Sequence, residues 1–106
     1  MVTQERITAL KDEIVRKFRP DKVILFGSYA HGRPTQESDV DLLVVLPFEG
    51  QPLAKNAEIR LAVKVDFALD LIAFSEPALR DRIELGDFFI QEITAKGKVL
   101  YAAANL

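Results

Sequence analysis

The chain has 106 residues, of which 49% are hydrophobic and 28% are charged, and its formal net charge is −2 at pH 7. That length is typical of one domain, and we predict a single domain over residues 1–106. The slight negative charge disfavours stable binding to nucleic acid, which needs clustered Lys and Arg, and the absence of cysteine excludes disulfides, zinc–thiolate sites and cysteine nucleophiles.

The N-terminal segment carries charges throughout, which is not typical of a signal peptide. No apolar run approaches the roughly 18–20 residues that a membrane-spanning helix needs. We therefore expect a soluble, cytoplasmic protein with no membrane partner.

The first third of the chain predicts a helix, a strand and a turn-rich segment. Thr3 can cap the helix, and Pro20 ends it because proline lacks the amide that the next turn would need. Apolar residues recur along it at helical spacing: Ile7, Leu10, Ile14 and Phe18. Residues 22–26 predict a short buried strand that stops at Gly27, and residues 27–38 are rich in turn formers.

The middle of the chain predicts a strand, a helix and a second strand. Residues 39–46 are the most strand-like segment. A loop rich in Pro and Gly separates them from a helix over residues 53–65, in which we expect Ala57 and Leu61 to face inward. Residues 67–74 predict the next strand.

The C-terminal part predicts one or two helices and an edge strand. Ser75 can cap a helix that holds Pro77 in its first turn, and Gly97 closes the last helix before a strand over residues 99–101. The expected apolar contacts are Leu79, Ile83, Phe89, Ile90 and Ile93. Phe88 and Phe89 are expected in the core, but adjacent aromatics cannot both point inward, so one of them can face a partner. Alternating helices and strands predict a mixed α/β (α+β) fold, a small mixed sheet packed with helices.

Two carboxylates begin the strand at residues 39–46. Because side chains alternate along a strand, Asp39 and Asp41 project from one face, followed there by Leu43 and Val45. At about 4 Å and an effective dielectric constant near 20, two such carboxylates repel each other by about 4 kcal/mol. A divalent cation turns this repulsion into attraction, and a site of oxygen ligands suits magnesium or manganese.

A third carboxylate, Asp70, lies inside a run that otherwise predicts a buried strand. An ionised carboxylate is costly there unless it is paired or metal-bound, although an edge position facing water or a lysine would also accommodate it. If its strand lies beside that of Asp39 and Asp41, three carboxylates converge as two-metal phosphoryl transfer requires. Asp66, at the end of the preceding helix, is interpreted as a solvated carboxylate and is left out of this group.

Gly27-Ser28 is a candidate phosphate-binding turn. A strand that ends in Gly-Ser can start a short helical turn over residues 29–31, whose free amides, with the serine hydroxyl, bind phosphate. Glycine lets the backbone approach a triphosphate because it has no Cβ.

GSYAHGRPTQESDVDLLVVL at residues 27–46 resembles the signature of the polymerase-β-like nucleotidyltransferase superfamily, and more narrowly its minimal members, antitoxins paired with HEPN-domain toxins. ALDLI at residues 68–72 and GKVLY at residues 97–101 extend the resemblance over most of the chain. The resemblance implies the nucleotidyltransferase (polymerase-β-like) fold, and ATP and Mg²⁺ (two ions) as substrate and cofactor.

The resemblance also implies roles for individual residues. Asp39 and Asp41 would coordinate both magnesium ions, while Asp70 would bind the catalytic ion and help to deprotonate the acceptor. Ser28 and the Gly27 backbone would hold the terminal phosphates of ATP. His31 departs from relatives that often carry arginine, a contact that Arg33 could replace.

The chain leaves nothing over to hold an acceptor, so a partner protein is expected to present it. The resulting hypothesis is an antitoxin that transfers AMP to a hydroxyl, such as that of a tyrosine, on a cognate HEPN ribonuclease toxin. The alternatives are transfer to a small molecule such as an antibiotic, and a non-catalytic antitoxin that acts by occlusion.

Overall fold

The computed structural model describes residues 1–104, and the last two residues of the predicted domain lie outside this range. The elements in chain order are α1 (Gln4–Phe18), β1 (Lys22–Phe26), β2 (Val40–Val45), α2 (Pro52–Val63), β3 (Leu69–Phe74), α3 (Glu76–Glu84), α4 (Phe88–Lys96) and β4 (Lys98–Ala102). Their alternation confirms the predicted mixed α/β class.

The strands of residues 1–104 form one four-stranded sheet in the order β3-β2-β1-β4. β2 and β3 are parallel, whereas β1 runs antiparallel to both of its neighbours, β2 and β4. The C-terminal end of β1 therefore meets the N-terminal ends of β2 and β3 at one end of the sheet. β4 is an edge strand, as residues 99–101 predict.

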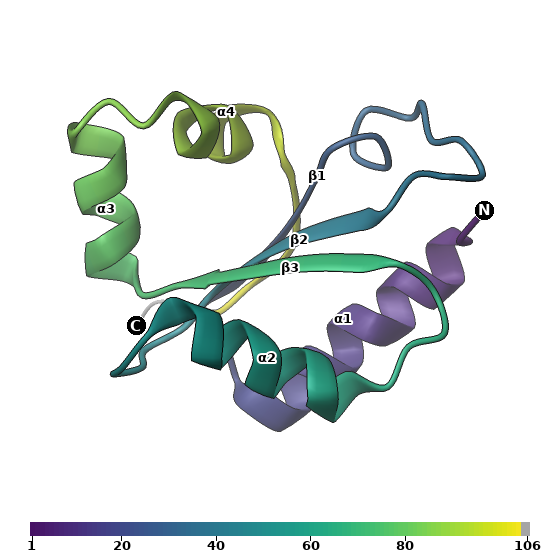
Figure 1. The fold of residues 1–106 in the computed structure, drawn as a ribbon, viewed down its shortest axis with the longest axis horizontal. Helices are drawn as coiled ribbons and strands as arrows, with labels where there is room; N and C mark the ends of the chain where they lie inside the picture. Colours follow the sequence, from purple (N-terminus) through teal and green to yellow (C-terminus); the bar gives the residue numbers. More distant parts are fainter. Residues whose placement is uncertain (105–106) are drawn as a thin grey trace.

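Helices cover both faces of the sheet: α1 and α2 lie on one side, α3 and α4 on the other (Figure 1). Val40, Leu42 and Val44 pack toward α1 and α2. Leu43 and Val45 pack on the opposite face, against Leu79 of α3 and Ile90 and Ile93 of α4. Burial on both faces explains the uninterrupted apolar sequence of these central strands.

The predicted caps at Thr3 and Ser75 and the helix end at Gly97 are confirmed, whereas α2 ends at Val63, two residues before the predicted end. The hydroxyl of Thr3 accepts a hydrogen bond from the Arg6 amide, and that of Ser75 accepts one from the Ala78 amide. Gly97 ends α4, and its amide donates to the Ile93 carbonyl. Within residues 1–104, no helix has both the length and the apolar character needed to cross a bilayer.

The prediction that Ala57 and Leu61 face inward in α2 is wrong. The buried residues of this helix are Ile59 and Val63, whereas the side chain of Leu61 is 78% exposed. Residues 53, 57 and 61 form an apolar row as regular as the row through Ile59 and Val63, so periodicity could not choose between them. In the folded chain, α2 packs against α1 and β3 through the row that contains Ile59 and Val63.

The prediction that Phe88 and Phe89 lie in the core is also wrong. Their side chains are 73% and 57% exposed, because Ile90 and Ile93 take the sheet-facing side of this short helix. Phe89 still makes an edge-on contact with Phe26, at 5.8 Å between ring centroids.

Candidate active site

The predicted site residues come from three neighbouring strands and meet at one end of the sheet. Asp41 lies directly opposite Asp70 in the parallel pairing of β2 with β3. On its other side Asp41 pairs with Phe26, the last residue of β1, and Gly27 follows immediately. Asp39 and Asp70 are exposed, and Asp41 is half-buried. The strand of Asp70 thus lies beside the strand of Asp41, which meets the condition stated for this group of carboxylates.

The electrostatics of this cluster act most strongly on Asp41. Burial, followed by the negative charges of Asp70 and Asp39, raises the pKa of Asp41 from 3.8 to about 6. Charges of like sign therefore crowd around this carboxylate. A cation placed among the three carboxylates would relieve that repulsion.

Gly27 is required at the end of β1 for two reasons. Its φ of 73° lies in the left-handed region, which a side chain disfavours. A Cβ at this position would also collide with the carboxylate of Asp41, whose Cγ would be 3.1 Å away. The candidate phosphate-binding turn therefore lies in van der Waals contact with the Asp41 carboxylate.

The turn after Gly27 has the helical form that the sequence predicts. The amides of Ala30 and His31 both donate to the Gly27 carbonyl, at 3.1 and 3.3 Å. Within residues 1–104, the amides of Ser28 and Tyr29 donate to no protein acceptor. Two adjacent free amides beside a serine hydroxyl are hydrogen-bond donors of the kind that bind a phosphate group.

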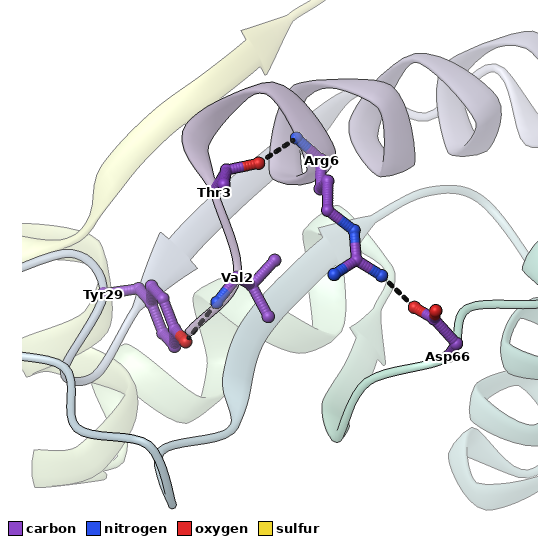
Figure 2. Close-up of polar contacts among 5 residues, drawn as sticks. All are labelled: Val2, Thr3, Arg6, Tyr29 and Asp66. Atoms are coloured by element: carbon purple, nitrogen blue, oxygen red, sulfur yellow. Dashed lines mark hydrogen bonds and ion pairs between the residues drawn. The ribbon is translucent and has the colours of Figure 1, made fainter.

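The N-terminus anchors this turn to the rest of the molecule. The hydroxyl of Tyr29 accepts a hydrogen bond of 3.0 Å from the amide of Val2, just before the Thr3 cap of α1 (Figure 2). Figure 2 also shows the ion pair between Arg6 and Asp66, which is exposed. The side chain of Asp66 is 82% exposed, in agreement with its interpretation as a solvated carboxylate.

The donor chemistry of the site fits magnesium, because Asp41 and Asp70 face each other across strands spaced about 4.8 Å apart and Asp39 precedes Asp41 by two residues. However, among residues 1–104 no group of three or more His, Cys, Asp or Glu side chains is close enough together to hold a metal ion. Binding an ion would therefore require the carboxylates to turn toward one another. The roles of Asp39, Asp41, Asp70, Gly27 and Ser28 stay predictions.

Two cavities flank the carboxylates. One, of about 590 Å³, opens between α2 and the start of β3, and its lining includes Asp39, Arg60 and Lys64. The other, of about 180 Å³, lies beside Gly27 and is lined in part by His31 and by residues of α4. Sequence analysis missed Arg60 and Lys64 because the inward face of α2 was assigned incorrectly.

The model of the nucleotidyltransferase domain family matches residues 7–101. This chain belongs to the nucleotidyltransferase domain family. The match includes every residue of the sheet end described above, and it confirms that the chain is a nucleotidyltransferase.

A relative from Methanocaldococcus jannaschii, named "Putative protein adenylyltransferase MJ0604", is 33% identical over 98 residues, which are 92% of this chain and 93% of the relative. A crystal structure of a toxin–antitoxin with AMP-PNP superposes with a TM-score of 0.65 at 25% identity, over 91% of this chain and 73% of that one. The toxin–antitoxin MntA–HpeT gives a TM-score of 0.61 at 22% identity, over 96% and 75% of the two chains, and shows the shared fold. The fold is that of the nucleotidyltransferases.

Proposed function

We propose that this nucleotidyltransferase is a magnesium-dependent protein adenylyltransferase, which moves AMP from ATP to a hydroxyl on a partner protein. The related protein of M. jannaschii carries the name of a protein adenylyltransferase, and a structural neighbour is a toxin–antitoxin with AMP-PNP, an ATP analogue. We further propose that the chain is an antitoxin of the cytoplasm and that its partner is a HEPN-domain ribonuclease toxin, which the modification silences.

The observation that carries this proposal is the proximity of Gly27 to Asp41. It brings a turn with free amides against a group of carboxylates, so that the phosphates of a nucleotide and the cation that accompanies them can share one site. A phosphate-binding turn alone, or a carboxylate pair alone, would not support nucleotidyl transfer.

In the proposed reaction, the amides of Ser28 and Tyr29 and the Ser28 hydroxyl hold the β- and γ-phosphates. The acceptor oxygen attacks the α-phosphorus in line. An O–P bond forms, the bond to the bridging oxygen breaks, and pyrophosphate leaves with that electron pair. The proton of the acceptor hydroxyl passes to the Asp70 carboxylate, which is exposed and returns it to water. Magnesium, held by Asp39, Asp41 and Asp70, would supply charge neutralisation for the triphosphate.

The test is to purify the chain with its native partner, separate the two, and incubate them with ATP and magnesium. We expect an AMP-sized mass increase on the partner with the native chain and with the control Asp66→Asn, which removes a carboxylate outside the site. We expect none with Asp39→Asn combined with Asp41→Asn. No mass increase on the partner, together with modification of small acceptors, would refute the proposal. If the double variant still inhibits the ribonuclease activity of the partner completely, the chain acts by occlusion instead.

A further inference from the structure

In-line attack fixes the side from which the acceptor must approach. The proposed phosphate turn follows β1, on one side of Asp41, whereas Asp70 lies on the other side, in β3. An attacking oxygen must enter opposite the leaving pyrophosphate. If the proposed function is correct, the acceptor therefore reaches the site from the β3 edge of the sheet.

The larger of the two cavities opens at that edge, on the face of the sheet that α1 and α2 cover, whereas Asp41 and Asp70 project from the opposite face. It is a groove of about 590 Å³ between α2 and the segment that leads into β3. Asp39 belongs to its lining, which links the groove to the carboxylate cluster; the other lining residues relevant here are Arg60, Leu61, Lys64, Phe67 and Leu69. We call this surface the α2–β3 groove.

The charge of the α2–β3 groove is opposite to that of the whole chain. Arg60 and Lys64 are exposed, and within residues 1–104 neither has an ion-pair partner. By contrast, Lys55 on the same helix pairs with Glu58, and the chain as a whole carries a net charge of −2. Two unpaired cations beside a cavity favour an anionic occupant.

The rest of the α2–β3 groove suits a polypeptide. Leu61 is 78% exposed and offers an apolar contact. β3 is an edge strand, and the carbonyls of Ala68 and Phe74 accept from β2, so the backbone of Leu69 points away from the sheet. An extended segment could therefore hydrogen-bond to the start of that edge at Leu69; farther along, the outward amide of Ala73 already donates to the side chain of Asn56 in α2.

We propose that the α2–β3 groove docks an acidic, extended segment of the partner protein, with Arg60 and Lys64 binding its carboxylates. Because Asp70 projects from the face of the sheet opposite to α2, a segment docked there reaches the Asp70 carboxylate around the β3 edge. The proposal rests on the proposed function and names the class of acceptor that the same site takes.

The probe is a random copolymer of glutamate and tyrosine, compared with a copolymer of lysine and tyrosine, and the readout is transfer of label from ATP labelled at the α-phosphate. The test variant is Arg60→Glu with Lys64→Glu. The matched control is Arg16→Glu with Arg19→Glu, which changes the net charge equally at one helical and one left-handed position; both are exposed, lie outside the groove and have no ion-pair partner within residues 1–104. Arg60→Glu alone is a second variant that leaves the left-handed residue Lys64 in place.

We expect labelling of the acidic copolymer only, with kcat/KM reduced roughly 10- to 100-fold in the groove variants through a higher KM for the copolymer. The control variant and the binding of Mg–ATP should be unchanged. Equal labelling of both copolymers, no labelling of the acidic one, full activity of the groove variants, or weakened ATP binding in them would each overturn the docking proposal. The proposed function fails separately, if the native partner receives no AMP from the native chain.

Discussion

Asp41 and Asp70 lie directly opposite each other on adjacent parallel strands, at the end of the sheet where β1 turns at Gly27. Two carboxylates in this position repel each other in the metal-free protein, and a cation bound between them would remove that repulsion. If the proposed cation binds here, the repulsion that destabilises the metal-free protein also strengthens the affinity of the site for the cation. The first two predictions separate these two effects.

Replacing Asp41 by Asn should make the metal-free protein more stable at high pH. The pKa of Asp41 is about 6 in the folded chain against 3.8 in the unfolded one, so the folded chain binds more protons between these values. The stability contributed by the protonated group is complete below about pH 4 and is lost as the pH rises through about 6. We expect the variant to gain on the order of 1 kcal/mol at pH 8, after allowing for solvent screening at a half-exposed site, and nothing at pH 4.

Urea unfolding from pH 4 to 8 in the presence of a chelator measures this difference. Asp81→Asn, which removes an exposed carboxylate of α3, is the control and should follow the wild type at every pH. A difference between Asp41→Asn and wild type that does not change with pH would contradict the prediction.

Magnesium should stabilise the wild-type chain, and more strongly at pH 8 than at pH 5. A proton on Asp41 competes with the cation, and a ligand at ten times its Kd stabilises by about 1.4 kcal/mol. Thermal unfolding with and without magnesium measures the shift in Tm. An equal shift in Asp41→Asn would mean that the ion binds elsewhere.

Gly27→Ala should cost more stability than Gly32→Ala. The two glycines have nearly the same φ, 73° and 71°, but an added Cβ meets the Asp41 carboxylate at the first and nothing within 4 Å at the second. We expect about 1 kcal/mol for Gly32→Ala from backbone strain, and up to about 1 kcal/mol more for Gly27→Ala, because the new methyl group forces the Asp41 carboxylate to turn away.

A double-mutant cycle with Asp41→Ala isolates that collision. The Cβ of Asp41 would lie 3.5 Å from the new methyl group, an ordinary contact, so the excess cost should disappear once the carboxylate is removed. Additive costs in the cycle would show that Gly27 and Asp41 do not interact.

Ile59→Ala should destabilise the fold far more than Leu61→Ala. The side chain of Ile59 is fully buried against the sheet, whereas that of Leu61 is 78% exposed on the same helix. We expect about 2–5 kcal/mol for the first substitution and less than about 0.5 kcal/mol for the second, as measured by chemical denaturation. Similar losses of stability in the two variants would mean that the face of α2 with Leu61 also packs inward.

Tyr29→Phe should cost about 1 kcal/mol, because the amide of Val2 loses its hydrogen-bond acceptor. Tyr101→Phe is the matched control, since within residues 1–104 no protein group bonds to the hydroxyl of Tyr101. Equal thermal stability of the two variants would show that the contact between the N-terminus and the phosphate turn adds nothing.

The sequence predicted features that depend on near neighbours in the chain. Thr3 and Ser75 cap helices through an amide three residues on, and β1 spans residues 22–26, as the apolar run indicates. The alternation of side chains along β2 also placed Asp41 on the face of Leu43 and Val45, because the period of a strand is a local property. The choice of face in α2 failed because two apolar rows competed on one helix.

The sequence by itself determined the fold class, the turn at Gly27 and the identity of the three carboxylates, because each follows from residue type and short-range spacing. Only the tertiary structure decided that Asp70 lies opposite Asp41, that Gly27 must lack a side chain to clear the Asp41 carboxylate, and that Arg60 and Lys64 border a groove beside Asp39. Those relationships join segments far apart in the chain, and their geometry follows from strand register and helix packing, which depend on the whole core.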